Sequence, residues 1–170
     1  MKISFKTRIR KQLIEAAKSY SNLLNVQITV SSNLFVVSKR YILRFYKTNF
    51  LHLTGVKTEL SAEDFFNKCF DEMISENDFD CDSTKEIKGF VRQKIKHLVN
   101  FDNIFTQKLL FQEKFIKGNI SCAFATTNGE CTIGFVDAKY CVRPKTILDK
   151  NHLDKSKDII EVVPLIERIY

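Results

Sequence analysis

Apolar residues recur at helical spacing in three segments of the chain. In residues 6–24 they return every three or four positions, and charged residues occupy many of the positions between them. Residues 61–73 and 83–100 show the same period, and each begins with a pair typical of a helix start, Ser61 with Asp64 and Ser83 with Glu86. The pattern predicts three amphipathic helices. Asp64 is an approximate match, because the capping box usually carries Glu or Gln at that position.

Two stretches of the first half have patterns typical of strands. Residues 26–30 and 34–37 are β-branched or aromatic runs separated by SSN, which predicts a hairpin. In RYILRFYKTNFLHLTGV, residues 40–56, large apolar residues alternate with polar ones within ILRFY and within FLHLT. This period of two predicts two more strands.

The second half contains the strongest short hairpin signal, the Asn-Gly dipeptide at 128–129. A two-residue turn there pairs Phe124 with Ile133 and Cys122 with Phe135, so the apolar residues of both strands share a face. KYCVRP and DIIEVVPLIERIY predict further extended segments, whose prolines must lie at strand ends, bulges or edges.

These elements predict an α+β protein in which helices pack on one face of a mostly antiparallel sheet. A length of 170 residues with 44% hydrophobic content is enough for one substantial core, so a single domain over residues 1–170 is expected.

Cysteine usage and the first residues favour a cytoplasmic protein. The five cysteines are odd in number and at least nine residues apart, which suits neither a disulfide framework nor a zinc site. The first twenty residues lack the long apolar segment of a signal peptide, and no window approaches the ~18 apolar residues of a membrane span. We therefore expect reduced thiols, a cytoplasmic location and no membrane contact.

Charge indicates a class of partner. The formal net charge of +7 and a pI near 9.1 favour binding to polyanions. The basic residues are spread from one end of the chain to the other, so folding must assemble any positive surface. Nucleic-acid binding and a merely Lys-rich solvated surface both fit this composition.

The stretch at 40–56 carries the most specific candidate chemistry. If ILRFY and FLHLT are strands, Arg44, Tyr46, His52 and Thr54 lie on one face, opposite the core side chains. A cation, a phenol, an imidazole and a hydroxyl are groups that can hold a phosphate and move protons around it. The alternative is the ordinary solvated face of a half-covered sheet.

The motif FLHLTGV, followed by SAEDFFNKCF, an Asn-Gly hairpin and the segment YCVRPKTIL, resembles the phage-associated barnase, EndoU, colicin and RelE-like nucleases, in particular their fourth subgroup. The resemblance covers most of the chain in the order of elements. It implies a small α+β ribonuclease-like fold with helices before an about four-stranded antiparallel sheet, whose open face binds RNA.

The resemblance also implies a set of site residues. His52 and Thr54 match FLHLTGV, and Arg143 and Thr146 match the later basic segment. His52 would serve as general acid or base, since an unperturbed imidazole pKa near 6.5 suits either task.

Further side chains near the same face would complete the site. Arg44 would hold phosphoryl oxygens together with the later arginine, and Tyr46 would stack on a base or donate a proton. Lys47, Lys139 and Lys145 are the expected nucleic-acid-binding lysines. The remaining histidines, in a Lys-rich helix face and in a loop, are interpreted as surface residues.

The sequence therefore predicts a metal-independent endoribonuclease, associated with a toxin or a phage, that cleaves RNA by attack of a ribose 2′-hydroxyl and needs no cofactor. RNA, with tRNA as one candidate, and a cognate inhibitor protein are the expected partners. The alternative is a non-catalytic RNA-binding or protein-inhibitor module encoded by a phage or another mobile element. A metal-dependent hydrolase is disfavoured because the acidic residues are scattered.

Overall fold

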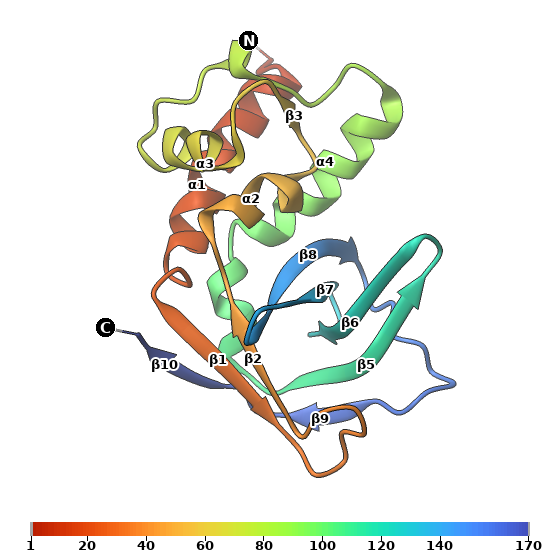
Figure 1. The fold of residues 1–170 in the computed structure, drawn as a ribbon. Coiled ribbons are helices and arrows are strands. Elements are labelled where there is room, and N and C mark those ends of the chain that lie inside the picture. The colour runs from red at the N-terminus through yellow and green to blue at the C-terminus, as the bar shows by residue number, and fades with distance from the viewer. Residues whose placement is uncertain (1, 170) are drawn as a thin grey trace.

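The computed structural model describes residues 2–169, in which the helices gather at one end of a curled sheet (Figure 1). The four α-helices of this part are α1 (Phe5–Ser21), α2 (Lys47–Thr54), α3 (Ala62–Phe70) and α4 (Lys85–Leu98). Two 3-10 helices, η1 (Glu76–Asp78) and η2 (Phe101–Thr106), flank α4 in the sequence. No helix among the described residues is both long enough and apolar enough to cross a membrane.

The main sheet has eight strands in the order β10-β1-β2-β8-β7-β6-β5-β9. Their bounds are β1 (Val26–Ser31), β2 (Arg40–Arg44), β5 (Leu109–Lys117), β6 (Ile120–Thr127), β7 (Cys131–Ala138), β8 (Cys141–Asp149), β9 (Ile160–Val162) and β10 (Leu165–Arg168). β2 and β8 pair in parallel, and the other neighbours are antiparallel. Two short strands, β3 (Lys57–Thr58) and β4 (Phe79–Asp80), form a separate pair.

The α+β class is confirmed, but the expected about four-stranded antiparallel sheet with helices on one face is wrong. The four strands β5–β8 form a continuous antiparallel meander, and β1, β2, β9 and β10 extend it on both sides. The sheet curls into a half-barrel (Figure 1). β9 and β10 follow each other in sequence, yet β9 pairs with β5 and β10 pairs with β1, at opposite edges of the sheet. Pairings between segments so far apart in the chain leave no local signal in the sequence.

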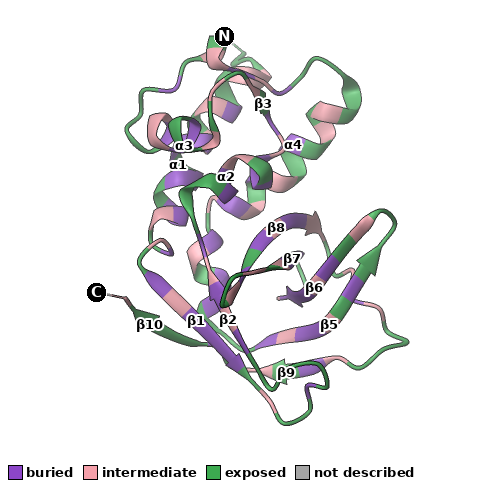
Figure 2. Ribbon diagram, viewed as in Figure 1, coloured by how far each residue is buried: buried purple, intermediate pink, exposed green. Residues whose placement is uncertain are grey.

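An aromatic cluster joins the helices to the sheet. Tyr20 of α1 is fully buried, and its ring lies 5.4–6.1 Å from the rings of Phe45, Phe50, Phe66 and Phe101. Buried positions lie on the inner faces of the helices and along the central strands, whereas β10 is exposed throughout (Figure 2). The Tyr20 hydroxyl donates a hydrogen bond of 2.7 Å to the backbone carbonyl just before α2, which fixes where that helix begins.

The three predicted helices are confirmed, although their starts shift by one or two residues and each ends two or three residues earlier than predicted. Ser61 caps α3 and accepts a hydrogen bond of 3.1 Å from the Asp64 amide, as predicted. The residue that caps α4 is Thr84 rather than Ser83, and it accepts from the Ile87 amide at 3.1 Å. Both hydroxyls satisfy an amide that the helix itself leaves unpaired.

The prediction of a strand at FLHLT is wrong, because this segment belongs to helix α2. Phe50, Leu53 and Thr54 are buried, a helical spacing that the alternation of leucines with His52 obscures in the sequence. Gly55 ends the helix in the left-handed conformation at φ 77°, which a residue without Cβ adopts most easily. ILRFY does contain a strand, since β2 ends at Arg44.

The strand predicted at residues 34–37 is also wrong, because these residues lie in the loop between β1 and β2. The Glu113 carboxylate of β5 accepts hydrogen bonds from the backbone amides of Val36, Val37 and Ser38 at 2.6–3.1 Å. A side chain therefore satisfies the donors that a strand partner would otherwise take. The hairpin partner of β1 is β2.

The hairpin at the Asn-Gly dipeptide is confirmed, but its predicted register is wrong by two residues. Phe124 pairs with Phe135 rather than Ile133. The Asn128 side chain accepts hydrogen bonds from the two amides at 130 and 131 and so widens the loop. Pro144 lies beside an irregularity in the β7–β8 register, as its missing donor requires.

Candidate functional site

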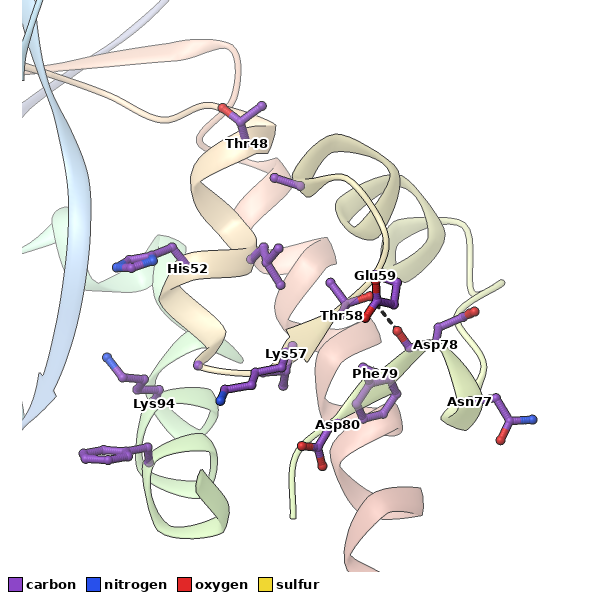
Figure 3. Close-up of a pocket in the computed structure, with 15 residues that line it drawn as sticks. Thr48, His52, Lys57, Thr58, Glu59, Asn77, Asp78, Phe79, Asp80 and Lys94 are labelled. Atoms are coloured by element: carbon purple, nitrogen blue, oxygen red, sulfur yellow. Dashed lines mark hydrogen bonds between the residues drawn. The ribbon is translucent and has the colours of Figure 1, made fainter. Parts of the chain in front are cut away.

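An open groove of about 1110 Å³ lies between α2, α4 and the β3–β4 pair. His52 and Lys94 line one end of it, Glu59 and Asp78 line the other, and Lys57 and Asp80 lie between them (Figure 3). His52 and Lys94 project to the same side, away from the two aspartates (Figure 3). The groove therefore has a basic and an acidic end.

His52 stands in a positive field. It lies on the exposed side of α2, and its pKa is lowered from the ordinary value first by partial burial of the ring and then by the charges of Lys94, Lys145 and Arg143. These groups come from α4 and β8, so the fold brings together side chains far apart in the sequence. A lowered pKa leaves the imidazole neutral and able to accept a proton at neutral pH.

Lys94 is held in place by the neighbouring strand. Its ammonium donates to the carbonyl of Ile147 at 2.9 Å and to the hydroxyl of Thr146 at 3.4 Å, and burial lowers its pKa. A Cβ at Gly55 would lie 3.1 Å from Lys94 Cδ, so a side chain there would press on the lysine stem. An ammonium has three donors, so one remains for a ligand.

The cations around His52 lack acidic partners. The five ion pairs found in residues 2–169 include none of Lys94, Arg143 and Lys145. Arg143 is exposed and Lys145 is half-buried, with both on β8. Positive charge that is gathered without an ion-pair partner favours a bound anion.

A second group of predicted residues extends this positive surface along β2 and β8. Leu43 pairs with Val142 in the parallel β2–β8 ladder, so Arg44 and Arg143 follow on the same face of adjacent strands. The Arg44 guanidinium carbon lies 5.6 Å from the centroid of the exposed Tyr46 ring. The Arg44 Nε is buried without a hydrogen-bond partner in the described part of the chain.

Tyr46 also contacts a cysteine of β8. Its hydroxyl lies 3.8 Å from the sulfur of Cys141, and this hydrogen bond, together with partial burial, raises the pKa of the phenol. The phenol therefore keeps its proton at neutral pH.

Three other predicted residues lie outside this arrangement. Thr54 is fully buried, where its hydroxyl donates to the Leu51 carbonyl at 2.7 Å and accepts from the Val56 amide at 3.2 Å, so it serves the end of α2. The Lys47 ammonium lies 6.0 Å from the centroid of the Phe66 ring. The Lys139 ammonium lies 5.3 Å from the centroid of the Tyr140 ring, in the turn between β7 and β8.

His97 and His152 are not surface residues as expected. The side chain of His97 is only 11% exposed and lies 2.8 Å from an Asp149 carboxylate oxygen, which also pairs with Lys96 at 3.0 Å. His152 is half-buried, and its Nε2 lies 2.6 Å from the backbone carbonyl of Asp149. His97 lines a different, smaller hollow from His52, so the two imidazoles do not share a groove.

Sequence reasoning missed Lys94 as a site residue. It lies in the α4 segment with Lys88, Arg92 and Lys96, and its charge alone does not distinguish it from them. Its neighbours on α4, Val91 and Ile95, are buried, and a lysine at the border of an apolar stripe is the one available signal of partial burial.

The site residues and a family match indicate the same class of protein. No group of three or more His, Cys, Asp or Glu side chains within residues 2–169 could hold a metal ion. An accessible imidazole among unpaired cations suits a protein that acts on phosphate esters. The chain belongs to the family described as phage-Barnase-EndoU-ColicinE5/D-RelE like nuclease 4, whose model matches residues 12–168.

The match confirms the resemblance seen in FLHLTGV and YCVRPKTIL and supports a nuclease function in general terms, with nucleic acid as the substrate. No curated protein and no solved structure matched the chain.

Proposed function

We propose that the chain is a metal-independent endoribonuclease that cleaves RNA by attack of a ribose 2′-hydroxyl on the adjacent phosphodiester. The observation that carries the proposal is the accessible His52 imidazole among Lys94, Arg143 and Lys145, which have no acidic partners in the described residues. A toxin- or phage-associated role, a tRNA substrate and a cognate inhibitor belong to the same proposal. The proposal also includes a single domain that spans residues 1–170.

His52 acts as the general base in this scheme. Its lowered pKa keeps it neutral, so it accepts the proton of the 2′-hydroxyl as the oxygen attacks phosphorus. Lys94, with one free donor and a pKa lowered by burial, binds the phosphate and gives a proton to the departing 5′-oxygen. The P–O5′ bond breaks, and the products are a 2′,3′-cyclic phosphate and a 5′-hydroxyl.

The remaining cations hold the substrate. Arg143 and Lys145 bind non-bridging oxygens of the scissile phosphate, where negative charge builds up in the transition state. Arg44 holds a neighbouring phosphate through its guanidinium group, and Tyr46 beside it stacks on a base or donates a proton. Thr146 positions Lys94 by accepting its hydrogen bond.

The test is cleavage of a short RNA with mapped ends. We expect cleavage that persists in EDTA, yields 2′,3′-cyclic phosphate ends, and fails when the ribose at the cleavage site is 2′-deoxy. Activity that vanishes in EDTA and returns with Mg²⁺, or that cuts DNA equally well, would show that the chemistry is assigned wrongly. Salt-sensitive RNA binding without cleavage would favour the non-catalytic alternative.

A further inference from the structure

Phe90 is an exposed aromatic ring at the basic end of the groove. It is 59% exposed on α4 and lines the same groove as His52 and Lys94. Within the described residues it belongs to neither hydrophobic cluster, and α4 already anchors itself through Val91 and Ile95. The packing of the protein therefore gives no reason for a large apolar side chain at this position.

The spacing along α4 places the ring beside the phosphate-binding groups. Phe90 and Lys94 are four residues apart, so they are neighbours on one helix face, with Cβ atoms ~5–6 Å apart. A nucleotide has the same two parts at a similar separation, a charged phosphate and a flat apolar base. An aromatic ring next to a cation is the usual arrangement of sites that hold unpaired bases.

The acidic end of the groove fixes the direction in which a nucleotide lies. Glu59, Asp78 and Asp80 outnumber Lys57 among the residues at and beside that end, so it disfavours a phosphate. Of these three carboxylates, only that of Asp78 forms an ion pair within residues 2–169, with Lys68 at 3.6 Å. The pKa of Asp80 is lowered mainly by a hydrogen bond from Ser83, so this carboxylate is charged at neutral pH. The end formed by His52 and Lys94 has no carboxylate among the described residues that line it and is therefore the favoured position for the phosphate.

We propose that Phe90 stacks on an unpaired nucleobase next to the scissile phosphate, so that the site takes single-stranded RNA. The inference rests on the proposed ribonuclease function and adds to it a substrate class and a specificity-determining residue. A base inside a duplex is already stacked between its neighbours and cannot present a face to Phe90. Pairing of the flanking nucleotide therefore removes the contact.

The experiment compares Phe90→Ala and Phe90→Trp with the wild type on a single-stranded RNA that has one mapped cleavage site. We expect Phe90→Ala to lower kcat/KM by about 10- to 100-fold, mainly through KM, since stacking on one base contributes about that factor. Phe90→Trp should keep activity within about threefold. The matched control is Phe70→Ala, because Phe70 is also exposed, at 43%, but does not line the groove.

A second substrate separates stacking from a structural effect. It carries an abasic ribose at the nucleotide on one or the other side of the scissile phosphate. If Phe90 stacks on that base, the abasic RNA is a poor substrate for the wild type, and Phe90→Ala costs it no further activity. A Phe90→Ala loss of the same size on abasic and intact RNA at both positions would overturn the inference, as would full activity of Phe90→Ala on the intact RNA.

The same variants distinguish failure of this inference from failure of the proposed function. If the wild type cleaves RNA and Phe90→Ala cleaves it equally well, the ribonuclease proposal stands and the base subsite is excluded. If the wild type cleaves no RNA, the proposed function fails, and fluorescence anisotropy with a 2′-deoxy-substituted oligonucleotide decides the subsite. Weaker binding by Phe90→Ala that depends on the base would still support stacking, and equal binding would exclude it.

Discussion

His52 and His97 lie on two different helices that both contact strand β8, yet their surroundings are opposite. His52 is exposed and surrounded by the charges of Lys94, Lys145 and Arg143. His97 is nearly buried and bonded to a carboxylate at 2.8 Å. The cations around His52 form no ion pair among the described residues, whereas His97 is paired with Asp149.

The difference separates a binding site from a structural contact. A buried or half-buried charge with a hydrogen-bonded partner holds two elements together, as His97 and Asp149 hold α4 to β8. Cations gathered without a partner cost free energy in the absence of a ligand and are typical of functional sites. The two histidines can thus be assigned opposite roles, and each assignment can be tested by mutation.

The largest expected effect is the loss of activity in His52→Ala. We expect kcat/KM for RNA to fall by at least ~10²-fold, because a positioned general base contributes that much. The melting temperature should barely change, since substitutions of exposed residues alter stability by within ~0.5 kcal/mol. His97→Ala is the matched control and should keep most of the activity measured at a temperature where it is folded. Equal losses in the two variants would contradict the comparison.

A smaller effect is expected on the stability of His97→Ala. Removing the bond to Asp149 should lower the free energy of unfolding at pH 7 by about 1 kcal/mol, measured by urea denaturation. The bonds from His97 and Lys96 lower the pKa of Asp149, so the stability that they contribute is present above the unfolded pKa of about 3.9 and is lost as pH falls through the folded value.

The difference in free energy of unfolding between the wild type and His97→Ala should therefore become smaller below about pH 4. Asp149→Asn should lower the free energy of unfolding at pH 7 by a similar amount, whereas Lys155→Gln, in an exposed loop, should not. A difference that is constant down to low pH would show that the His97 ring contributes by packing rather than through the carboxylate.

The smallest expected effect is on the titration of His52 itself. Lys94→Met removes a nearby positive charge, so the pKa of His52 should rise, measured from the imidazole signals by NMR. Lys94→Arg keeps the charge and should leave the pKa closer to that of the wild type. An unchanged or lower His52 pKa in Lys94→Met would show that the lysine does not set the field at the imidazole.

Local sequence signals predicted the helices and the later hairpin, because caps, period and turn residues act over a few positions. Ser61 does cap α3, and the chain does turn at Asn128. The helix at FLHLT was missed because leucines two apart imitate a strand, although Gly55 at its end was a usable signal for a helix.

The candidate site was predicted only in part, because it depends on contacts between distant segments. His52, Arg143 and Lys145 do come together, but they do so across a helix and a strand rather than on one sheet face. Thr54 was assigned to the site from the strand period and from its place in FLHLTGV, and in the structure its hydroxyl completes the end of α2. The position of Lys94 beside Val91 and Ile95 indicates partial burial but not a site, since only the contact with β8 distinguishes it as a site residue.

The parallel pairing of β2 with β8 has a consequence for synthesis of the protein. Leu43 and Val142 are about a hundred residues apart in the chain, and two of the cations around His52, Arg143 and Lys145, follow Val142 on β8. Contacts of such long range form late in folding, because the loop between them must first close. On the ribosome, the N-terminal helices can emerge and fold while β8 is still untranslated. A nascent chain therefore carries His52 without Arg143 and Lys145, and the full positive field forms only after β8 has been translated.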